Sequence, residues 1–330
     1  MIEGHGDDLY RYENITMNFS SNIYNGTDLS ALEAFLSSRM GVVRSYPEPS
    51  AASLELMIAH DCGISPDEVL VTSGAVDAIY LIAQAYRHEG TCQILQPTFR
   101  EYEDACHVFG FQEREDGALC WLCNPNNPSG QVLSADEVMA IAKRHRLLIV
   151  DQSYEDYTTA PLPTPAQTVK HGNIILLHSM TKRYAVPGLR LGYVTATASI
   201  ISRLRAQYRP WAINALSLEA GKWLVEQGKT AIPDLSSYLA ETQRLRQGLN
   251  KIDNIETMET STNFFLCTIR TATASELKEY LAREHGILIR DASNFTGLTP
   301  HHFRIATQSP AENDALIAAI RCFVTTYNIN

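Results

Sequence analysis

The sequence predicts an α/β protein with a mainly parallel sheet, helices on both faces of that sheet, and a smaller α+β region at the C-terminus. Short apolar runs alternate with amphipathic helical stretches from residue 69 to residue 196. This alternation is typical of a parallel sheet that is buried on both faces. From residue 255 the alternation gives way to a different order of strand-like and helical runs, which indicates a second lobe.

Each element is predicted from its period and its boundary residues. In residues 75–86, for example, Val76, Ile79 and Ala83 fall on one helical stripe, and Ser134 is placed to cap a helix over 135–144. Strands are predicted at 69–72, 92–96, 119–123, 147–150, 174–178, 191–196, 263–269, 287–290 and 302–307. Other helices are predicted at 31–40, 51–60, from about 102, within 200–249, at 274–285 and at 310–327.

The chain divides into three expected parts. Residues 1–30 are irregular and polar, and we expect this N-terminal segment to pack with the small domain and the active site. Residues 31–230 form the predicted large domain, and residues 231–330 the small C-terminal domain.

Composition narrows the possible classes of protein. The chain of 330 residues is 45% hydrophobic and 19% charged, as in an ordinary soluble globular protein. A net charge of −10 argues against a partner that is nucleic acid or an anionic membrane. No apolar run reaches the ~18 residues that span a bilayer, and Met1–Asp8 has no signal-peptide pattern, so a cytoplasmic location is expected.

The seven cysteines predict reduced, buried thiols. Cys120 and Cys123 have CxxC spacing, but they lie within a strand-like run and have no second pair of ligands, so no metal site is predicted.

Polar motifs follow nearly every predicted strand, at the edge where open α/β sheets bind ligands. Gly74 opens a helix after the strand 69–72, so the amides of Ala75 and Val76 are candidates for binding a phosphate. Phe99, after the strand 92–96, could stack on a planar ring, although a core aromatic is an alternative interpretation.

The next two strands end in an amide-rich turn and a carboxylate. Asn124–Gly130 contains three asparagines and two prolines, and the carboxamides of this turn could donate to a phenolic oxygen, although a plain structural turn is an alternative. Asp151 ends the strand 147–150, where a buried carboxylate needs a cation such as a protonated pyridine nitrogen. Tyr154 could reach the same ligand. The alternative for Asp151 is a helix cap.

The stretch 179–192 supplies an amine. Lys182 stands close to the hydroxyls of Ser179 and Thr181, and Arg190 follows eight residues later. A lysine amine can form a Schiff base, and hydroxyls with an arginine can hold a phosphate. A solvated loop is the alternative for this stretch alone. Taken together, the strand ends supply a phosphate site, a ring, an amide, a carboxylate and an amine, which predicts a site for pyridoxal 5'-phosphate (PLP).

These motifs resemble the fold type I PLP enzymes of the aspartate aminotransferase superfamily, in order and over essentially the whole chain. The most specific motifs are Asn-Pro-Asn-Asn-Pro-Ser-Gly, Asp151-x-x-Tyr154 and the stretch from Ser179 to Tyr193. The resemblance implies that Lys182 is the Schiff-base lysine, with Asp151 and Tyr154 as further catalytic residues. The cofactor-binding residues that it implies are Tyr46, Ala75, Val76, Phe99, Asn127, Asp151, Tyr154, Ser179, Thr181, Lys182 and Arg190.

The resemblance also implies a homodimer with shared active sites, because Tyr46 matches a tyrosine that reaches the cofactor phosphate of the neighbouring subunit. Arg304, in His-Phe-Arg-Ile, matches the arginine that binds a substrate α-carboxylate. The expected substrate-binding residues are His5, Gly6, Asn22, Asn127, Arg290 and Arg304.

Four stretches resemble the threonine-phosphate decarboxylase branch more than the histidinol-phosphate aminotransferase branch. They begin at Gly4, Arg209, Ile287 and His302. The resemblance therefore implies decarboxylation of L-threonine O-3-phosphate to (R)-1-aminopropan-2-yl phosphate for the cobalamin side chain. The alternatives are a histidinol-phosphate-type aminotransferase and a PLP-binding protein with a regulatory role. Asp7 and Gln308 depart from the branch pattern, where glycine and arginine are common.

Overall fold

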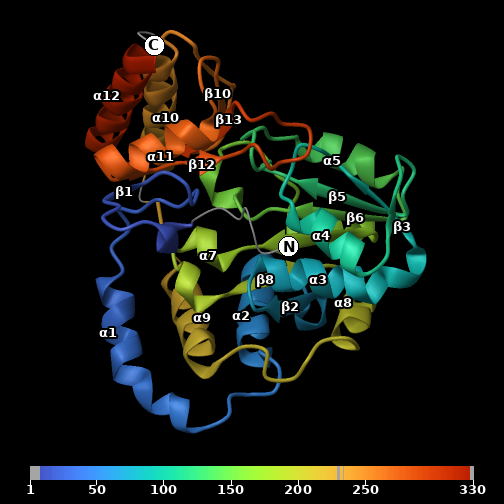
Figure 1. Cartoon of the computed structure of the whole chain (residues 1–330). Helices are drawn as coiled ribbons and strands as arrows, with labels where there is room; N and C mark the ends of the chain where they lie inside the picture. The colour runs from blue at the N-terminus through green and yellow to red at the C-terminus, as the bar shows by residue number, and fades with distance from the viewer. Residues whose placement is uncertain (1–7, 229–230, 233, 328–330) are drawn as a thin grey trace.

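The computed structural model describes residues 8–228, 231–232 and 234–327. The larger of its sheets has seven strands in the order β2-β8-β7-β6-β5-β3-β4 (Figure 1). All neighbouring strands are parallel except β8, which is antiparallel to both β2 and β7. The strands are β2 (Val69–Thr72), β3 (Thr91–Ile94), β4 (Gln112–Glu113), β5 (Leu119–Cys123), β6 (Leu147–Asp151), β7 (Ile174–His178) and β8 (Gly192–Thr195). The carboxyl ends of β3, β5, β6 and β7 consequently meet at one edge.

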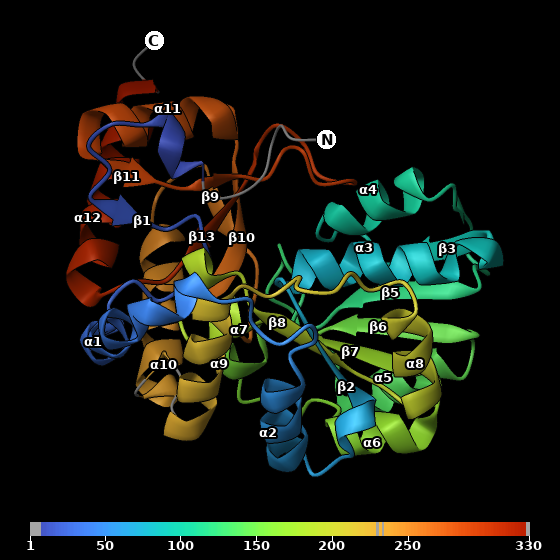
Figure 2. The ribbon, with the colours of Figure 1, turned by 90° about the horizontal axis from the view of Figure 1, so that it is seen from below.

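Helices cover both faces of this sheet (Figure 2). One face packs against α3 (Ala75–Tyr86), α4 (Glu101–Val108) and α8 (Ala198–Arg205) through a core that includes Trp121. The other face packs against α5 (Ala135–Ala142), and α6 (Pro165–His171) contacts β7. Because both faces are buried, the strands need apolar residues at nearly every position, which explains the continuous apolar runs in the sequence.

A second group of helices lies beside β2 and β8. Helices α2 (Ala52–Cys62) and α9 (Ala215–Gln227) share a core with these strands. Helix α1 (Ser30–Arg39) lies along α9, where the rings of Phe35 and Trp223 stack with centroids 5.6 Å apart.

The smaller lobe contains a four-stranded antiparallel sheet in the order β12-β13-β10-β9. Its strands are β9 (Ile255–Thr257), β10 (Phe264–Ile269), β12 (Arg290–Asp291) and β13 (His302–Ala306). Helices α10 (Leu235–Leu249), α11 (Ala274–His285) and α12 (Pro310–Tyr327) pack against this sheet in one core. From the N-terminal segment, β1 (Met17–Asn18) pairs in parallel with β11 (Ile287–Leu288), so residues far apart in the sequence lie side by side here (Figure 2).

The predicted fold class is confirmed: a mainly parallel sheet with helices on both faces is followed by a smaller α+β lobe. The prediction missed β1, β4 and β9, which have only two or three residues and therefore no measurable period. It also missed α6, whose start is marked by a capping box between Thr164 and Gln167. The predicted domain boundaries at residues 30/31 and 230/231 stay predictions.

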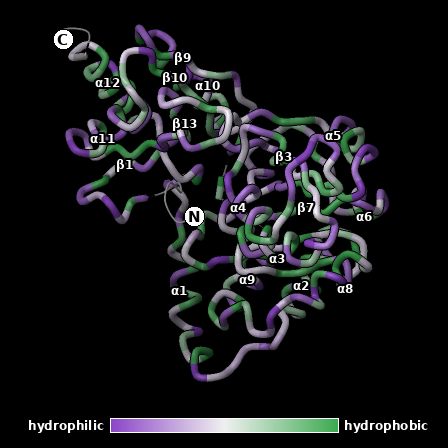
Figure 3. Tube along the Cα trace, turned by 45° about the vertical axis from the view of Figure 1, so that its right-hand side comes forward, coloured by the Kyte–Doolittle hydropathy of each residue, from purple (hydrophilic) through white to green (hydrophobic). Residues whose placement is uncertain are grey.

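Hydrophobic and hydrophilic segments are interspersed along the coloured part of the trace (Figure 3). Among the residues that the structure describes, no helix is long and apolar enough to cross a membrane. Cys120 and Cys123 are free, buried thiols that belong to the cores on opposite faces of the large sheet. Their side chains therefore cannot act as a CxxC pair.

Candidate active site

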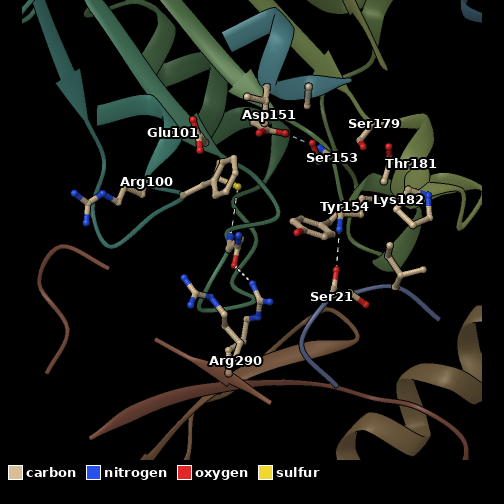
Figure 4. A pocket seen from close by; sticks show the side chains of 18 of the residues that line it. Ser21, Arg100, Glu101, Asp151, Ser153, Tyr154, Ser179, Thr181, Lys182 and Arg290 are labelled. Atoms are coloured by element: carbon tan, nitrogen blue, oxygen red, sulfur yellow. Dashed lines mark hydrogen bonds between the residues drawn. The ribbon is translucent and has the colours of Figure 1, made fainter. Parts of the chain in front are cut away.

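A cavity of about 370 Å³ opens at the carboxyl edge of the large sheet, where the two lobes meet. Its walls come from the large sheet, the N-terminal segment and the small lobe (Figure 4). Twelve of the predicted site residues line it. These are Ala75, Val76, Phe99, Asn127, Asp151, Tyr154, Ser179, Thr181, Lys182, Arg190, Arg290 and Arg304.

One end of the cavity is built to hold an anion. Gly74 precedes α3 with φ +85°, and a Cβ on it would lie 2.8 Å from the guanidinium of Arg190. The arginine therefore lies directly over the start of the helix, where free backbone amides and the helix dipole favour negative charge. The hydroxyl of Thr181 is buried here and has no hydrogen-bond partner among the described residues. Ser179 lies beside it (Figure 4).

Asp151 ends β6 and is only 4% exposed. Its Oδ2 accepts a 2.6 Å hydrogen bond from the hydroxyl of Tyr102, and its Oδ1 accepts a 2.8 Å bond from the amide of Ser153. Burial and the neighbouring Asp151 carboxylate raise the pKa of Tyr102 well above its usual value. The ring of Tyr102 in turn stacks on Trp121, with centroids 5.4 Å apart. These two hydrogen bonds fix the orientation of the Asp151 carboxylate.

Lys182 lies on α7 (Met180–Arg183), directly after β7. Its Nζ donates a 2.7 Å hydrogen bond to the carbonyl of Ser21, and it lies 5.7 Å from the centroid of the Tyr154 ring (Figure 4). Burial raises the pKa of the Tyr154 phenol to about 12, although the nearby Arg304 acts in the opposite direction. Tyr154 therefore keeps its proton at neutral pH and can donate a hydrogen bond.

Two arginines lie opposite the sheet edge. Arg290 on β12 and Arg304 on β13 are paired in register, and both are buried. Arg304 donates to the side-chain oxygen of Asn127 and to the carbonyl of Ser20. Arg290 donates a 2.8 Å bond to Asn294, and its burial lowers its pKa. Adjacent guanidinium groups of this kind are suited to carboxylates and phosphates.

Two of the predicted residues that the structure describes, Asn22 and Tyr46, do not line the cavity. Asn22 is fully buried and has φ +57°, while its neighbours Ser21 and Ile23 do line the cavity. Tyr46 is 86% exposed and lies in a separate groove. His5 and Gly6 lie outside the described residues.

The structure also adds residues that the sequence prediction did not assign. The carbonyls of Ser20 and Ser21 contact Arg304 and Lys182, and a backbone carbonyl carries no signal in a sequence. Tyr102 follows Phe99 by three residues, but only the structure shows its bond to Asp151. Other lining residues without a predicted role are Ile23, Arg100, Glu101, Cys123, Ser153, Pro187, Asn294 and Phe295.

Comparison with known proteins places this arrangement in a family. Residues 111–320 match the family model for aminotransferase class I and II. The chain belongs to the aminotransferase class I and II family. As a member of this family it is a PLP-dependent enzyme.

The chain is similar to members of this family with two different activities. A solved structure of L-threonine-O-3-phosphate decarboxylase from Porphyromonas gingivalis is 36% identical, has a TM-score of 0.89, and is matched over 94% of this chain and 99% of that chain. Threonine-phosphate decarboxylase of Salmonella typhimurium is 26% identical over 94% of this chain and 91% of its own. Histidinol-phosphate aminotransferase of Caldanaerobacter subterraneus subsp. tengcongensis is 28% identical over 94% of this chain and 95% of its own.

The residues of the cavity fit PLP. The Thr181 hydroxyl, which has no partner in the described part of the chain, and the guanidinium of Arg190 over Gly74 provide donors for a phosphate. Asp151 provides a fixed carboxylate for a protonated ring nitrogen, and the Lys182 amine lies within the same cavity. The anion site, the aromatic ring, the amide, the carboxylate and the amine that PLP needs are thus brought together from five separate strand ends.

Proposed function

We propose that this enzyme decarboxylates L-threonine O-3-phosphate to (R)-1-aminopropan-2-yl phosphate, a precursor of the cobalamin side chain. The observation that carries the proposal is the similarity to the Porphyromonas gingivalis decarboxylase, at 36% identity over nearly the full length of both chains. The two buried arginines support it, because the substrate has a carboxylate and a phosphate.

PLP, when bound, supplies an electron sink that stabilises the negative charge developing at the substrate Cα. In this proposal Ala75, Val76, Ser179, Thr181 and Arg190 hold its phosphate. Asp151 holds its ring nitrogen, Phe99 packs on the ring, and Asn127 and Tyr154 contact the ring oxygen.

The chain's other groups act on the substrate. Arg304 binds the α-carboxylate, and Arg290, with His5, Gly6 and Asn127, orients the rest of the molecule. The carboxylate leaves as CO2 when its bond to Cα breaks, and the Lys182 ammonium then donates a proton to Cα. The hydrogen bond that the Lys182 amine donates to the Ser21 carbonyl supports this proposed role, because it holds the amine at the cavity.

The second candidate is a histidinol-phosphate-type aminotransferase that uses 2-oxoglutarate and glutamate. It is favoured by the 28% identity to such an enzyme over 94% of the chain. In this reaction the Lys182 amine would take the Cα proton, and the carboxylate would stay on the substrate. The two reactions differ in which Cα bond is broken, so the same residues serve both.

One pair of assays separates the two candidates. The purified protein is loaded with PLP and incubated with L-threonine O-3-phosphate, and CO2 release is measured. In parallel, histidinol phosphate with 2-oxoglutarate is tested for glutamate. We expect CO2 release and little glutamate. Glutamate without CO2 would refute the decarboxylase, and full activity of Lys182→Ala in either assay would refute the assigned site.

We also propose that the enzyme is a homodimer in which Tyr46 contacts the cofactor phosphate of the neighbouring subunit. Tyr46 is 86% exposed, and its ring packs on Trp211 with centroids 5.6 Å apart. Met40 and Val43 are also more than half exposed on the same segment. Exposed apolar side chains gathered in this way are typical of a protein interface.

A further inference from the structure

We infer that Gln308 is a positioning residue, whose side-chain amide fixes the segment 20–25 so that two of its carbonyl groups meet Lys182 and Arg304. The inference concerns how the site proposed above is held, and it does not depend on which of the two reactions the enzyme catalyses. Gln308 follows β13 by two residues and does not line the cavity.

The amide of Gln308 is held at both of its polar atoms. Its Oε1 accepts a 3.0 Å hydrogen bond from the amide of Asn25, and its Nε2 donates a 3.0 Å bond to the carbonyl of Ile23. The backbone amide of Gln308 donates to Asn313 at 3.1 Å. The side chain is 1% exposed, so water does not compete for these bonds.

The segment that Gln308 holds carries contacts to both cationic groups. The Ser21 carbonyl accepts from Lys182, and the Ser20 carbonyl accepts from Arg304. On the N-terminal side, the Phe19 carbonyl accepts a 2.9 Å bond from the amide of Ala306. The two carbonyls therefore lie between one attachment at residue 19 and a second at residues 23 and 25.

The second attachment needs a glutamine in particular. The Ile23 carbonyl requires a donor and the Asn25 amide requires an acceptor, and a primary amide provides both at once. A carboxylate has no donor for Ile23 when it is ionised, and a guanidinium has no acceptor for Asn25. A guanidinium at this position would therefore lose the bond to Asn25, whereas the primary amide of Gln308 holds both Ile23 and Asn25.

Hydrogen exchange provides a direct test. In Gln308→Met, which keeps the length of the side chain and removes both bonds, we expect the amides of residues 19–25 to exchange roughly tenfold faster. The increase should appear in the cofactor-free protein and in the PLP-loaded protein. Thr242→Val is the matched control, because it removes a buried 2.9 Å bond to Thr307 in the same lobe without touching the segment.

Kinetics show whether the segment acts on the site. Because Arg304 is proposed to bind substrate, Gln308→Met should raise KM about tenfold, with a smaller change in kcat, for whichever substrate the enzyme turns over. Gln308→Glu should also raise KM. A uniform loss of kcat with unchanged KM, equal to that of Thr242→Val, would assign Gln308 a merely structural role.

A second pair of variants covers the case in which Gln308→Met does not fold. Asn25 is exposed, so Asn25→Pro removes the amide that Gln308 accepts from without changing the core. Asn25→Ala keeps that amide and loses only the side-chain bond to the Asn18 carbonyl. Faster exchange at residues 19–22 in Asn25→Pro than in Asn25→Ala supports the inference. Equal exchange in the two variants, or unchanged exchange in Gln308→Met, overturns it.

Discussion

The contact between Tyr102 and Asp151 illustrates how single residues fix the chemistry of the cavity. The phenol donates to Oδ2 of Asp151 at 2.6 Å, and both groups are buried. Removing one partner from a buried hydrogen bond leaves the other unsatisfied, which costs about 1–3 kcal/mol. Tyr102→Phe keeps the stacking on Trp121, so its effect comes from the lost hydroxyl.

We expect Tyr102→Phe to lower kcat by roughly tenfold and to weaken PLP binding, because Asp151 loses one of its two fixed donors. The measurements are kcat and the PLP dissociation constant from titration of the visible absorbance. Tyr280→Phe, which changes a partly buried phenol in the small lobe, is the control. Equal kcat values for Tyr102→Phe and the unmodified enzyme would show that Asp151 does not need this donor.

A second prediction at the residue scale concerns Asp156. Its carboxylate pairs at 3.3 Å with Arg183, the residue that follows Lys182. Burial raises the pKa of Asp156 to about 6, although Arg183 acts in the opposite direction. The folded protein therefore binds more protons than the unfolded chain between about pH 4 and pH 6, so this group's contribution to stability falls as pH rises through that window.

Asp156→Asn removes this dependence on pH. A change of about two pKa units corresponds to roughly 2–3 kcal/mol. The free energy of unfolding of the variant, minus that of the unmodified protein, should therefore rise by this amount between about pH 4 and pH 7. Urea denaturation of both proteins at each pH measures the difference. A gap that stays constant with pH would mean that the pKa of Asp156 is not raised.

At the scale of elements, the turn Asn124–Gly130 joins the two lobes. Gly130 has φ +73°, and its carbonyl accepts 3.1 Å bonds from the Ser261 amide and the Thr260 hydroxyl before β10. A Cβ on Gly130 would overlap the Phe264 carbonyl. The turn therefore requires glycine both for its backbone conformation and for the close approach of the small lobe.

Gly130→Ala should consequently lower the free energy of unfolding by about 2 kcal/mol or more, and lower Tm by several degrees. Calorimetry or circular dichroism measures both. Gly188→Ala is the control, since a methyl group on that glycine would meet no neighbouring atom within 4 Å and its φ is not in the left-handed region. A similar, small effect in both variants would contradict the requirement at Gly130.

The elements of the large lobe could be predicted because their signals are local. The apolar runs of β5, β6 and β7 and the polar groups that follow them are visible in the sequence, so Asp151 and Lys182 could be assigned to one edge. The contacts that orient these groups are not local. The Ser21 carbonyl lies 161 residues before Lys182, and Asn127 lies 177 residues before Arg304, and no period or spacing predicts such pairs.

At the scale of the whole molecule, the cavity depends on parts of the chain that are separated in sequence. The large sheet supplies the anion site, Asp151 and Lys182, whereas the small lobe supplies Arg290 (Figure 4). Arg304 also comes from the small lobe. The N-terminal segment connects the two, because it pairs with the small lobe through β1 and contacts Lys182 through Ser21. Any movement of one lobe against the other therefore changes the distance between the anion site and the arginines.

The proposed dimer is tested at this same scale. The groove beside Tyr46 encloses about 450 Å³ and includes Val43, which is 58% exposed, and Trp211, which is 50% exposed. Burying such side chains against a second copy of the chain would remove apolar surface from water, at about 25 cal/mol per Å². Light scattering after size exclusion should give the mass of two chains for the unmodified enzyme and of one chain for Val43→Asp.

The functional consequence follows from the position of Tyr46. Val43→Asp should also bind PLP more weakly, because the tyrosine of the neighbouring subunit is lost, whereas Tyr46→Phe should stay dimeric and lose only the hydroxyl contact. Met258→Asp, which places the same charge on an exposed side chain of the small lobe, should change neither mass nor PLP affinity. A monomer with full PLP affinity would contradict the shared site, and a Val43→Asp dimer would place the interface elsewhere.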